Sequence, residues 1–584
     1  MNQFYRKLYP LLFFVSALLS FSSVSYSTHA SKQVSHSMVA VSAIEGTLEI
    51  RLANYLDQNA KHSKKEVIEY ALRINDGTVY SLIFTDAVPK NLKTGQVIRI
   101  SKGMLKQTTK ANDLLVSAKD LTIVRDIALK EVPDAFGKQK TLVMLVNFQN
   151  NPTDKPWTQN EVKDTIFTTI NNMFYEFSYQ QTTMSGDVVG WYTIPMDSQA
   201  SCGDITNALP GLAQTAARNA GVDLSLYSRM VYMFPRASSC SWAGLGSLGG
   251  RPSNAWLNGV NSAPVTAHEL GHNLGLYHSH SLDCGGAVNE GTCTSVEYGD
   301  YADTMGAPSA FAGPHFNAFQ KERLGWLNFT TSPPIQTVTT SGTYTIDAYE
   351  SSNQNVKALK IEKASQSFSK DYYYVEFRQG IGFDKALSTC TDCNFTKGVI
   401  IHQANSVDGN SSNVLDMSPT DGNKTKQIAL MPGMTFRDAK ASNGGVTLYV
   451  ESVSAAGAKV RVTFGDTPPP PSCVQSAPRI MIGPGYAEIT QGQSQEYTVW
   501  VQNKDSAGCP PSNFAFTASK VHDQISVAVN PGSASIMPGA TQTISMVAST
   551  TASAPKGFYL VRIDAVNTAA PQYKTFTNGS LVVK

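Results

Sequence analysis

The segment from His268 to His278, HELGHNLGLYH, holds the residues with the clearest chemistry in the chain. His268 and His272 are four residues apart, so on a helix both rings lie on one face and can share a metal ion. His278 can return to the same ion as a third ligand if the chain turns back after the helix. Three imidazoles suit a tetrahedral zinc ion with one open position. Zinc held in this way turns water into a nucleophile near neutral pH, which indicates hydrolysis.

Two further residues fit this chemistry. Glu269 follows the first histidine, so it can point to the open position of the metal and accept a proton from the water there. Gly275 lets the chain leave the helix in a left-handed conformation that other residues resist. One alternative stays open, in which the histidines are satisfied polar residues of a helix or the ligands of a closed, structural zinc site.

The remaining histidines are weaker candidates as metal ligands. His280 lies two residues past His278 and is interpreted as a loop histidine. His315 and His402 are interpreted as surface or core residues. The others lie outside the region of the motif: His29, His36, His62 and His522. Asp300 and Asp303 make Ca²⁺ a candidate second ion, although their spacing matches no standard calcium loop.

The elements around the motif predict a mixed α/β domain over residues 137–327. Residues 142–148 form a continuous apolar run, as expected for a strand covered on both faces. A helical face packed on the core is predicted from apolar residues three or four apart: Val162, Ile166, Ile170, Met173 and Phe177. A second helix near 209–220 and a buried strand at 230–234 precede the histidine-bearing helix.

Residues 31–136 predict a separate N-terminal β domain, which is a candidate propeptide. Short alternating runs such as 47–52 and 79–84 read as strands, and Asp76-Gly77 is a turn signal between two such runs. The region has no cysteine, so it cannot inhibit a zinc enzyme with a thiolate. If it inhibits, it must do so with a carboxylate or by bulk.

The chain after the motif also has β character. Residues 328–465 predict a β-rich domain, and the Pro-rich stretch 466–472 predicts a linker. Residues 473–584 alternate with regular turn signals, which predicts an immunoglobulin-like β-sandwich. The fold class is therefore multidomain α+β: a mixed α/β catalytic domain flanked by an N-terminal β domain and C-terminal β-sandwich domains.

The N-terminus and the cysteines indicate export. Residues 1–30 read as a signal peptide, with Arg6 and Lys7 before an apolar run at 8–21. A retained membrane anchor stays an alternative, although the run is short and no later run approaches the ~18 residues of a spanning helix. The protein is therefore predicted to be secreted, with no stable membrane insertion after signal cleavage.

Eight cysteines form four local pairs, and we predict disulfides between neighbours: Cys202–Cys240, Cys284–Cys293, Cys390–Cys393 and Cys473–Cys509. The alternative for Cys390 and Cys393 is a redox or zinc clip. The formal net charge is only +2 and there is no basic run, so nucleic acid is excluded as a partner.

The motif resembles the extended zinc signature HExxHxxGxxH of the metzincin metallopeptidases. The stretch 297–306, EYGDYADTMG, resembles the metzincin Met-turn, which implies that Met305 forms an apolar floor beneath the histidines. Residues 315–327 end in Leu-Gly-Trp-Leu, and the order of these motifs resembles the gametolysin family and, more loosely, immune inhibitor A. The resemblance covers roughly 138–465 and implies a zinc-dependent endopeptidase. No tyrosine closely follows Met305, so a tyrosine ligand is not implied.

Two functions are compatible with these observations. The first is a secreted zinc endopeptidase that cleaves extracellular proteins or glycoproteins, with Glu269 as general base. The second is a non-catalytic secreted protein that binds a cell surface or polysaccharide and has a structural zinc site. Aromatic strands at 372–374 and Trp500 motivate the second function, and the C-terminal domain is its candidate contact surface.

Overall fold

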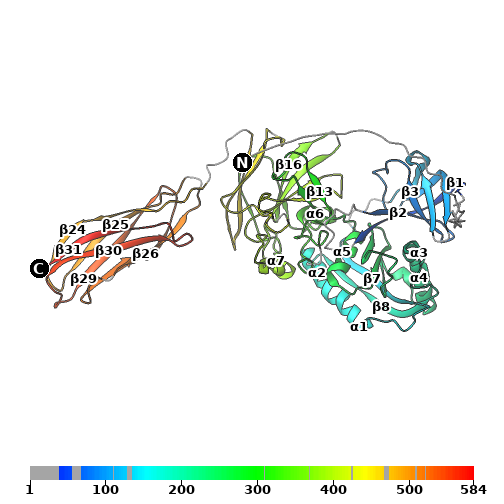
Figure 1. The fold of residues 1–584 in the computed structure, drawn as a ribbon, viewed down its shortest axis with the longest axis horizontal. Helices are drawn as coiled ribbons and strands as arrows, with labels where there is room; N and C mark the ends of the chain where they lie inside the picture. Colours follow the sequence, from blue (N-terminus) through cyan, green and yellow to red (C-terminus); the bar gives the residue numbers. More distant parts are fainter. Residues whose placement is uncertain are drawn as a thin grey trace, which may run out of the picture.

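The computed structural model describes residues 38–54, 67–108, 111–127, 134–307, 310–366, 368–422, 425–442, 444–465, 473–506, 509–519 and 521–584. The predicted signal peptide and the Pro-rich linker lie outside these residues. Within them the chain is mostly β, with strands β1 to β31 arranged in five sheets and few helices (Figure 1). The prediction of a multidomain α+β chain is confirmed in its coarse outline: several sheets, with strands far outnumbering helices.

The sheet that carries the motif's helix is built around parallel strands. Its order here is β10-β11-β9-β7-β8. Strands β11, β9, β7 and β8 are parallel to one another, and β10 runs antiparallel to β11. The bounds are β7 Gly137–Phe148, β8 Thr182–Ile194, β9 Arg229–Phe234, β10 Gly244–Ser247 and β11 Ser253–Asn258. Strand β9 is buried along its whole length, as expected for a strand covered on both faces.

Alternate residues of these strands face two separate cores. Val143 and Leu145 of β7 join a core with one group of helices: α1 (Gln159–Asp164), the π-helical η2 (Thr165–Ile170), α2 (Asn171–Phe177) and α5 (Ala263–Asn273). Leu142 and Met144 face the opposite core, which holds α3 (Cys202–Asn207) and α4 (Leu209–Asn219). The two predicted helices at 162–177 and 209–220 are thus present, on opposite faces of the sheet.

The N-terminal strands continue the same sheet. They are β1 (Met38–Asn54), β2 (Ile68–Arg73), β3 (Val79–Phe84), β4 (Val97–Thr108), β5 (Ala111–Val116) and β6 (Leu121–Arg125), with a short 3-10 turn η1 (Ala118–Asp120). They enclose a core of their own. Because β1 pairs with β10, the N-terminal strands and the motif's sheet form one 11-stranded sheet.

The chain after the motif forms two further sheets that pack on each other, the second pair of sheets. Seven strands have the order β13-β12-β19-β18-β17-β16-β14, four have the order β15-β22-β21-β20, and both sheets share one core. The bounds are β12 His280–Asp283, β13 Thr294–Val296, β14 Ile335–Val338, β15 Gly342–Ile346, β16 Ala358–Ser365, β17 Lys370–Glu376, β18 Ile400–Asn405, β19 Asn413–Leu415, β20 Thr435–Asp438, β21 Val446–Ser454 and β22 Gly457–Phe464. The helices of this region are α6 (Ala318–Leu324), η4 (Gly382–Asp384) and α7 (Lys385–Thr389). Strands β12 and β13 lie before residue 328, so the seven-stranded sheet contains residues from both sides of the domain boundary predicted there. The division into domains at residue 328 stays a prediction.

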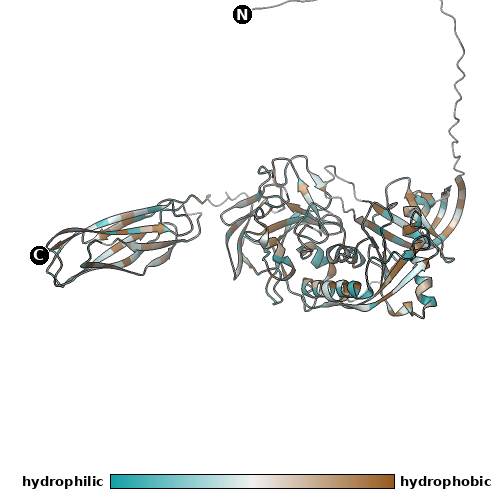
Figure 2. Ribbon diagram, turned by 60° about the horizontal axis from the view of Figure 1, so that its bottom comes forward, coloured by the Kyte–Doolittle hydropathy of each residue, from teal (hydrophilic) through white to brown (hydrophobic). Residues whose placement is uncertain are grey.

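The C-terminal part consists of two sheets with the orders β23-β25-β29-β27 and β24-β31-β30-β26-β28 around a common core. Its strands are β23 Arg479–Gly483, β24 Tyr486–Ile489, β25 Ser494–Gln502, β26 Ser512–Ala518, β27 Ile525–Asn530, β28 Ser533–Ile536, β29 Thr541–Thr550, β30 Gly557–Asn567 and β31 Lys574–Val583. Figure 2 shows apolar and polar residues alternating along them, as expected for strands with one face in the core. In the described part of the chain, no helix has the length and hydropathy needed to cross a bilayer.

Candidate metal centre

Helix α5 carries His268, Glu269 and His272, and all three side chains are buried. Pro264 lies in its first turn, where the missing N–H of proline costs no hydrogen bond. Gly271 faces the loop of Met305: a Cβ there would lie 2.4 Å from the Met305 sulfur. The helix therefore needs a glycine at this position to approach the loop.

The turn after α5 brings the chain back towards His268 and His272. Gly275 has a φ of +102°, as the sequence predicts. Its N–H donates to the His272 carbonyl at 2.8 Å, and the Leu276 N–H donates to the Gly271 carbonyl at 3.1 Å. These two bonds are the Schellman arrangement that ends a helix on a left-handed glycine. His278 lies three residues after Gly275 and is fully buried.

The structure brings the three predicted ligands together. The candidate ligand atoms of His268, His272 and His278 all lie within 4.8 Å of one another. The Nε2 atoms of His272 and His278 are 3.1 Å apart. Nε2 of His268 is buried and has no hydrogen-bond partner among the described residues.

The opposite nitrogen of each ring is held by the protein. Nδ1 of His268 lies 2.7 Å from the Thr304 carbonyl, and Nδ1 of His272 lies 2.7 Å from the Leu276 carbonyl. A carbonyl can only accept, so each Nδ1 carries the proton and each Nε2 has a free lone pair. Burial lowers the pKa of all three histidines, that of His268 to about 3, so the rings are neutral. Three neutral rings with converging lone pairs fit a zinc ion.

Glu269 lies against strand β10. A Cβ on Gly244 would lie 2.1 Å from Oε1 of Glu269; a Cβ on Gly246 would lie 2.8 Å from the Glu269 carbonyl oxygen and 3.2 Å from its Oε2. The two glycines therefore leave the space that the carboxylate fills. Strand β10 thus passes directly beside the predicted general base.

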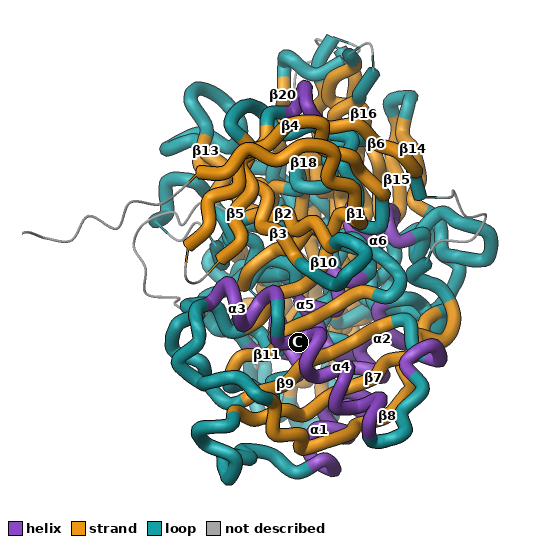
Figure 3. Tube along the Cα trace, turned by 90° about the vertical axis from the view of Figure 1, so that its right-hand side faces the viewer, coloured by secondary structure: helices purple, strands orange, loops and turns teal. Residues whose placement is uncertain are grey.

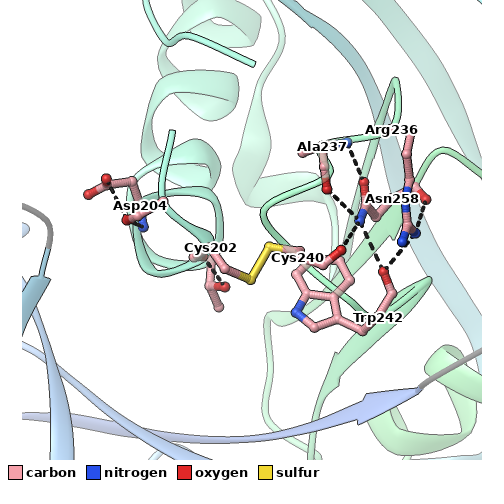
Figure 4. The surroundings of a disulfide bond; sticks show 9 residues. Cys202, Asp204, Arg236, Ala237, Cys240, Trp242 and Asn258 are labelled. Atoms are coloured by element: carbon pink, nitrogen blue, oxygen red, sulfur yellow. Dashed lines mark hydrogen bonds between the residues drawn. A yellow bond between two sulfur atoms is a disulfide. The ribbon is translucent and has the colours of Figure 1, made fainter. Parts of the chain in front are cut away.

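The loop that precedes β10 is held by a buried asparagine (Figure 4). The Asn258 amide donates to the carbonyls of Ala237, Cys240 and Trp242, and its oxygen accepts from the Ala237 N–H at 2.7 Å. Cys240 is also bonded to Cys202 of α3. The other three predicted disulfides are present as well. These bonds fix the loop from which β10 enters the site.

Met305 is fully buried, with its sulfur against Gly271 of α5. Its N–H donates to Asp303 at 2.7 Å, and the preceding Thr304 holds His268 through its carbonyl. Burial, followed by the charge of Asp300, raises the pKa of Asp303 to about 7. The loop thus supports both the helix and one of its histidines.

Glu297 is a site residue to which the sequence analysis gave no role. Its carboxylate accepts hydrogen bonds from Nδ1 of His278 and, at 3.0 Å, from Nε2 of His280. Burial opposes its ionisation, but these bonds lower the pKa of Glu297 to about 2. No local spacing marks this residue, which lies 19 positions after His278. Only its place just before the Met-turn could have drawn attention to it.

His280 is not a loop residue, contrary to the prediction. It begins β12, which pairs with β19 around Asn413, and its ring contacts Glu297 and the Ser412 carbonyl. The residue that pairs with His280, Asn413 of β19, lies more than a hundred positions away, so local sequence does not mark this strand position.

The other candidates lie outside the histidine cluster. His315 contacts Glu176 and Lys321, and His402 contacts Asp300. Asp300 and Asp303 belong to neither of the two groups of potential metal ligands in the described residues. The second of these groups contains Cys390 and Cys393, which are joined in a disulfide.

We expect Glu297→Gln to weaken zinc binding by about 10- to 100-fold, because carboxylates that orient metal-binding histidines have effects of this size. Competition with a zinc-sensitive dye measures the affinity. Glu290→Gln, which changes an exposed residue of the same loop region, is the matched control. An unchanged affinity in Glu297→Gln would show that this carboxylate does not orient His278.

Solved structures show only weak likeness to the chain. A family 123 glycoside hydrolase from Clostridium perfringens has 11% identity and a TM-score of 0.16; the match covers 19% of this chain and 27% of that hydrolase. The secreted serine protease VesC from Vibrio cholerae has 8% identity and a TM-score of 0.15, and the match covers 43% of this chain and 49% of that protein. Domains 4 and 5 of the S-layer protein SbsC have 16% identity and a TM-score of 0.14, with 30% and 83% covered. These TM-scores are too low to support a shared fold.

None of the curated proteins matches this sequence. The profile of the family described as gametolysin peptidase M11 matches residues 140–436, from the first strand of the motif's sheet into the second pair of sheets. This range is just over half of the chain and contains the histidine cluster, Glu269, Glu297 and Met305. The chain therefore belongs to the gametolysin peptidase family M11, a family of metallopeptidases.

Proposed function

We propose that the chain is a secreted zinc endopeptidase in which His268, His272 and His278 hold the metal and Glu269 is the general base. The observation that carries this proposal is the convergence of three buried, neutral imidazoles whose Nδ1 atoms are all engaged by the protein. Family membership independently supports a metallopeptidase that acts on proteins.

The chemistry divides between the ion and the chain. Zinc, when bound, would polarise the scissile carbonyl and lower the pKa of water. Glu269 accepts the proton of the attacking water and passes it to the leaving amine. Gly244 and Gly246 leave room for this carboxylate beside β10. Thr304, Leu276 and Glu297 keep the three rings in the tautomer that binds metal.

Secretion is proposed from the signal-like N-terminus and the four disulfides, which persist in oxidising compartments. A surface- or glycan-binding role for the C-terminal sheets is a second proposal, supported by side chains that are at least half exposed on β30 and β31: Phe558, Leu560 and Phe576. Retention of the zinc-loaded protein on polysaccharide without any proteolysis would favour this role over the enzyme.

Metal removal tests the enzymatic proposal. We expect a zinc chelator to abolish hydrolysis of denatured casein by the exported protein, because the attacking water is then no longer activated. One equivalent of zinc should restore the rate. Metal analysis should show that the zinc content falls and returns together with the activity. Full hydrolysis by protein shown to be free of zinc would contradict the proposal.

A further inference from the structure

The N-terminal part of the chain joins the motif's sheet at the strand that borders the metal centre. Residues Arg51, Leu52, Ala53 and Asn54 of β1 pair antiparallel with Ser247, Gly246, Leu245 and Gly244 of β10. Figure 3 shows β1 and β10 side by side. On its other side β10 pairs with β11, so without β1 it would be an open edge with free N–H and C=O groups.

This edge lies beside the predicted general base. Gly244, which is opposite Asn54, and Gly246, which is opposite Leu52, are the residues whose missing side chains make room for Glu269. An extended polypeptide that pairs with β10 must therefore pass next to this carboxylate. Adding a strand to an open sheet edge is a common way to bind an extended peptide.

Tyr298 connects the end of β1 to the metal centre. Its ring centroid lies 4.3 Å from that of His278 and 6.0 Å from that of His268. Its hydroxyl donates to the Ala53 carbonyl at 2.7 Å. The Tyr298 side chain therefore contacts both the β1 backbone and two of the rings that would hold the ion.

Two charged residues of β1 fasten it to the motif's domain. Arg51 is buried, ion-pairs with Glu49 at 2.6 Å, and donates to Asn207 of α3 at 2.8 Å. Its guanidinium lies 5.0 Å from the Trp256 ring centroid, and Glu49 accepts from Asn254 at 2.6 Å. Ala53 itself packs in the core that contains α3 and α4. The contact is therefore a buried, specific one.

We propose that β1 keeps the full chain latent by occupying the edge of β10 on which an extended polypeptide substrate pairs. This inference rests on the proposed function. The inhibitor is a paired backbone, which differs from the carboxylate or bulk expected from the sequence. A tethered strand acts at an effective concentration on the order of millimolar, so a substrate at micromolar concentration competes poorly with it.

Release of β1 should activate the chain. In the zinc-loaded full chain, Arg51→Ala combined with Ala53→Arg removes the Asn207 contact and places a long side chain where the core has room for alanine. We expect casein hydrolysis to rise by about tenfold or more while mass spectrometry shows the chain intact. Hydrogen exchange at the β10 amides should speed up in the same sample. Arg99→Ala, which removes an exposed pair with Glu45 elsewhere in the N-terminal sheet, should stay as latent as the wild type.

A second variant locks the contact. Ala53 and Leu245 are direct cross-strand partners, so Ala53→Cys with Leu245→Cys can form a disulfide between β1 and β10. We expect the oxidised form to be at least about tenfold slower than the same protein after mild reduction, with Leu245→Cys alone unaffected by the reductant. Equal rates before and after reduction would overturn the latency proposal. So would a release variant whose β10 amides exchange faster than those of the wild type but whose rate of casein hydrolysis is unchanged. If the zinc-loaded release and reduced variants cleave no substrate at all, the proposed function itself fails.

Discussion

Glu269→Gln is expected to keep its zinc and to lower kcat by about 10²- to 10⁴-fold, the usual contribution of a positioned general base. The glutamine amide has nearly the same shape, so it fills the same space beside Gly244 and Gly246. It cannot accept the proton of the attacking water. The three histidines keep their Nδ1 partners, so the metal should stay.

Casein hydrolysis and zinc content are measured on the same sample of this variant. Glu290→Gln, an exposed carboxylate outside the cluster, should behave as the wild type in both measurements. A Glu269→Gln protein that cleaves casein at the wild-type rate would exclude this residue as the base. Loss of zinc together with activity would instead assign the carboxylate a part in holding the metal.

Arg378→Ala is expected to lower the free energy of unfolding by about 3–5 kcal/mol, because it leaves buried carboxylates without their partner. Arg378 is fully buried and donates to Asp384 at 2.7 Å and to Glu376 at 3.0 Å. It also donates to the carbonyls of Ala302 and His315, on either side of Met305. The guanidinium therefore ties the second pair of sheets to the loop that contains Met305.

Urea unfolding followed by tryptophan fluorescence measures this effect. Arg461→Ala removes an exposed ion pair with Glu451 in the same region and should cost at most about 1 kcal/mol. Arg378→Lys keeps the charge but lacks the planar fork that serves several acceptors, so we expect an intermediate loss. If Arg378→Ala were no less stable than Arg461→Ala, the ion cluster would not hold this loop.

The parts of the site that local spacing determines could be predicted from the sequence. The four-residue interval of His268 and His272 places both rings on one face of α5, and Gly275 supplies the turn that returns His278. The same holds for the apolar steps that predict the helical run from α1 to α2. In each case the deciding interactions lie within a few turns of one helix.

Contacts between distant segments could not be predicted in this way. Glu297 reaches His278 and His280 only because β12 and β13 pair with each other and β12 joins β19. The pairing of β1 with β10 joins residues nearly two hundred positions apart. The sequence of neither strand indicates which other strand it pairs with. Register between such strands depends on which faces become buried together, which a single sequence does not display.

The central claim is that three imidazole nitrogens share one zinc ion and leave a position open to water. X-ray absorption at the zinc edge of the purified protein measures this coordination directly. We predict three nitrogen ligands at about 2.0–2.1 Å with an oxygen from solvent as the fourth ligand. A fourth ligand from the protein, such as a sulfur or a further imidazole, would contradict the account.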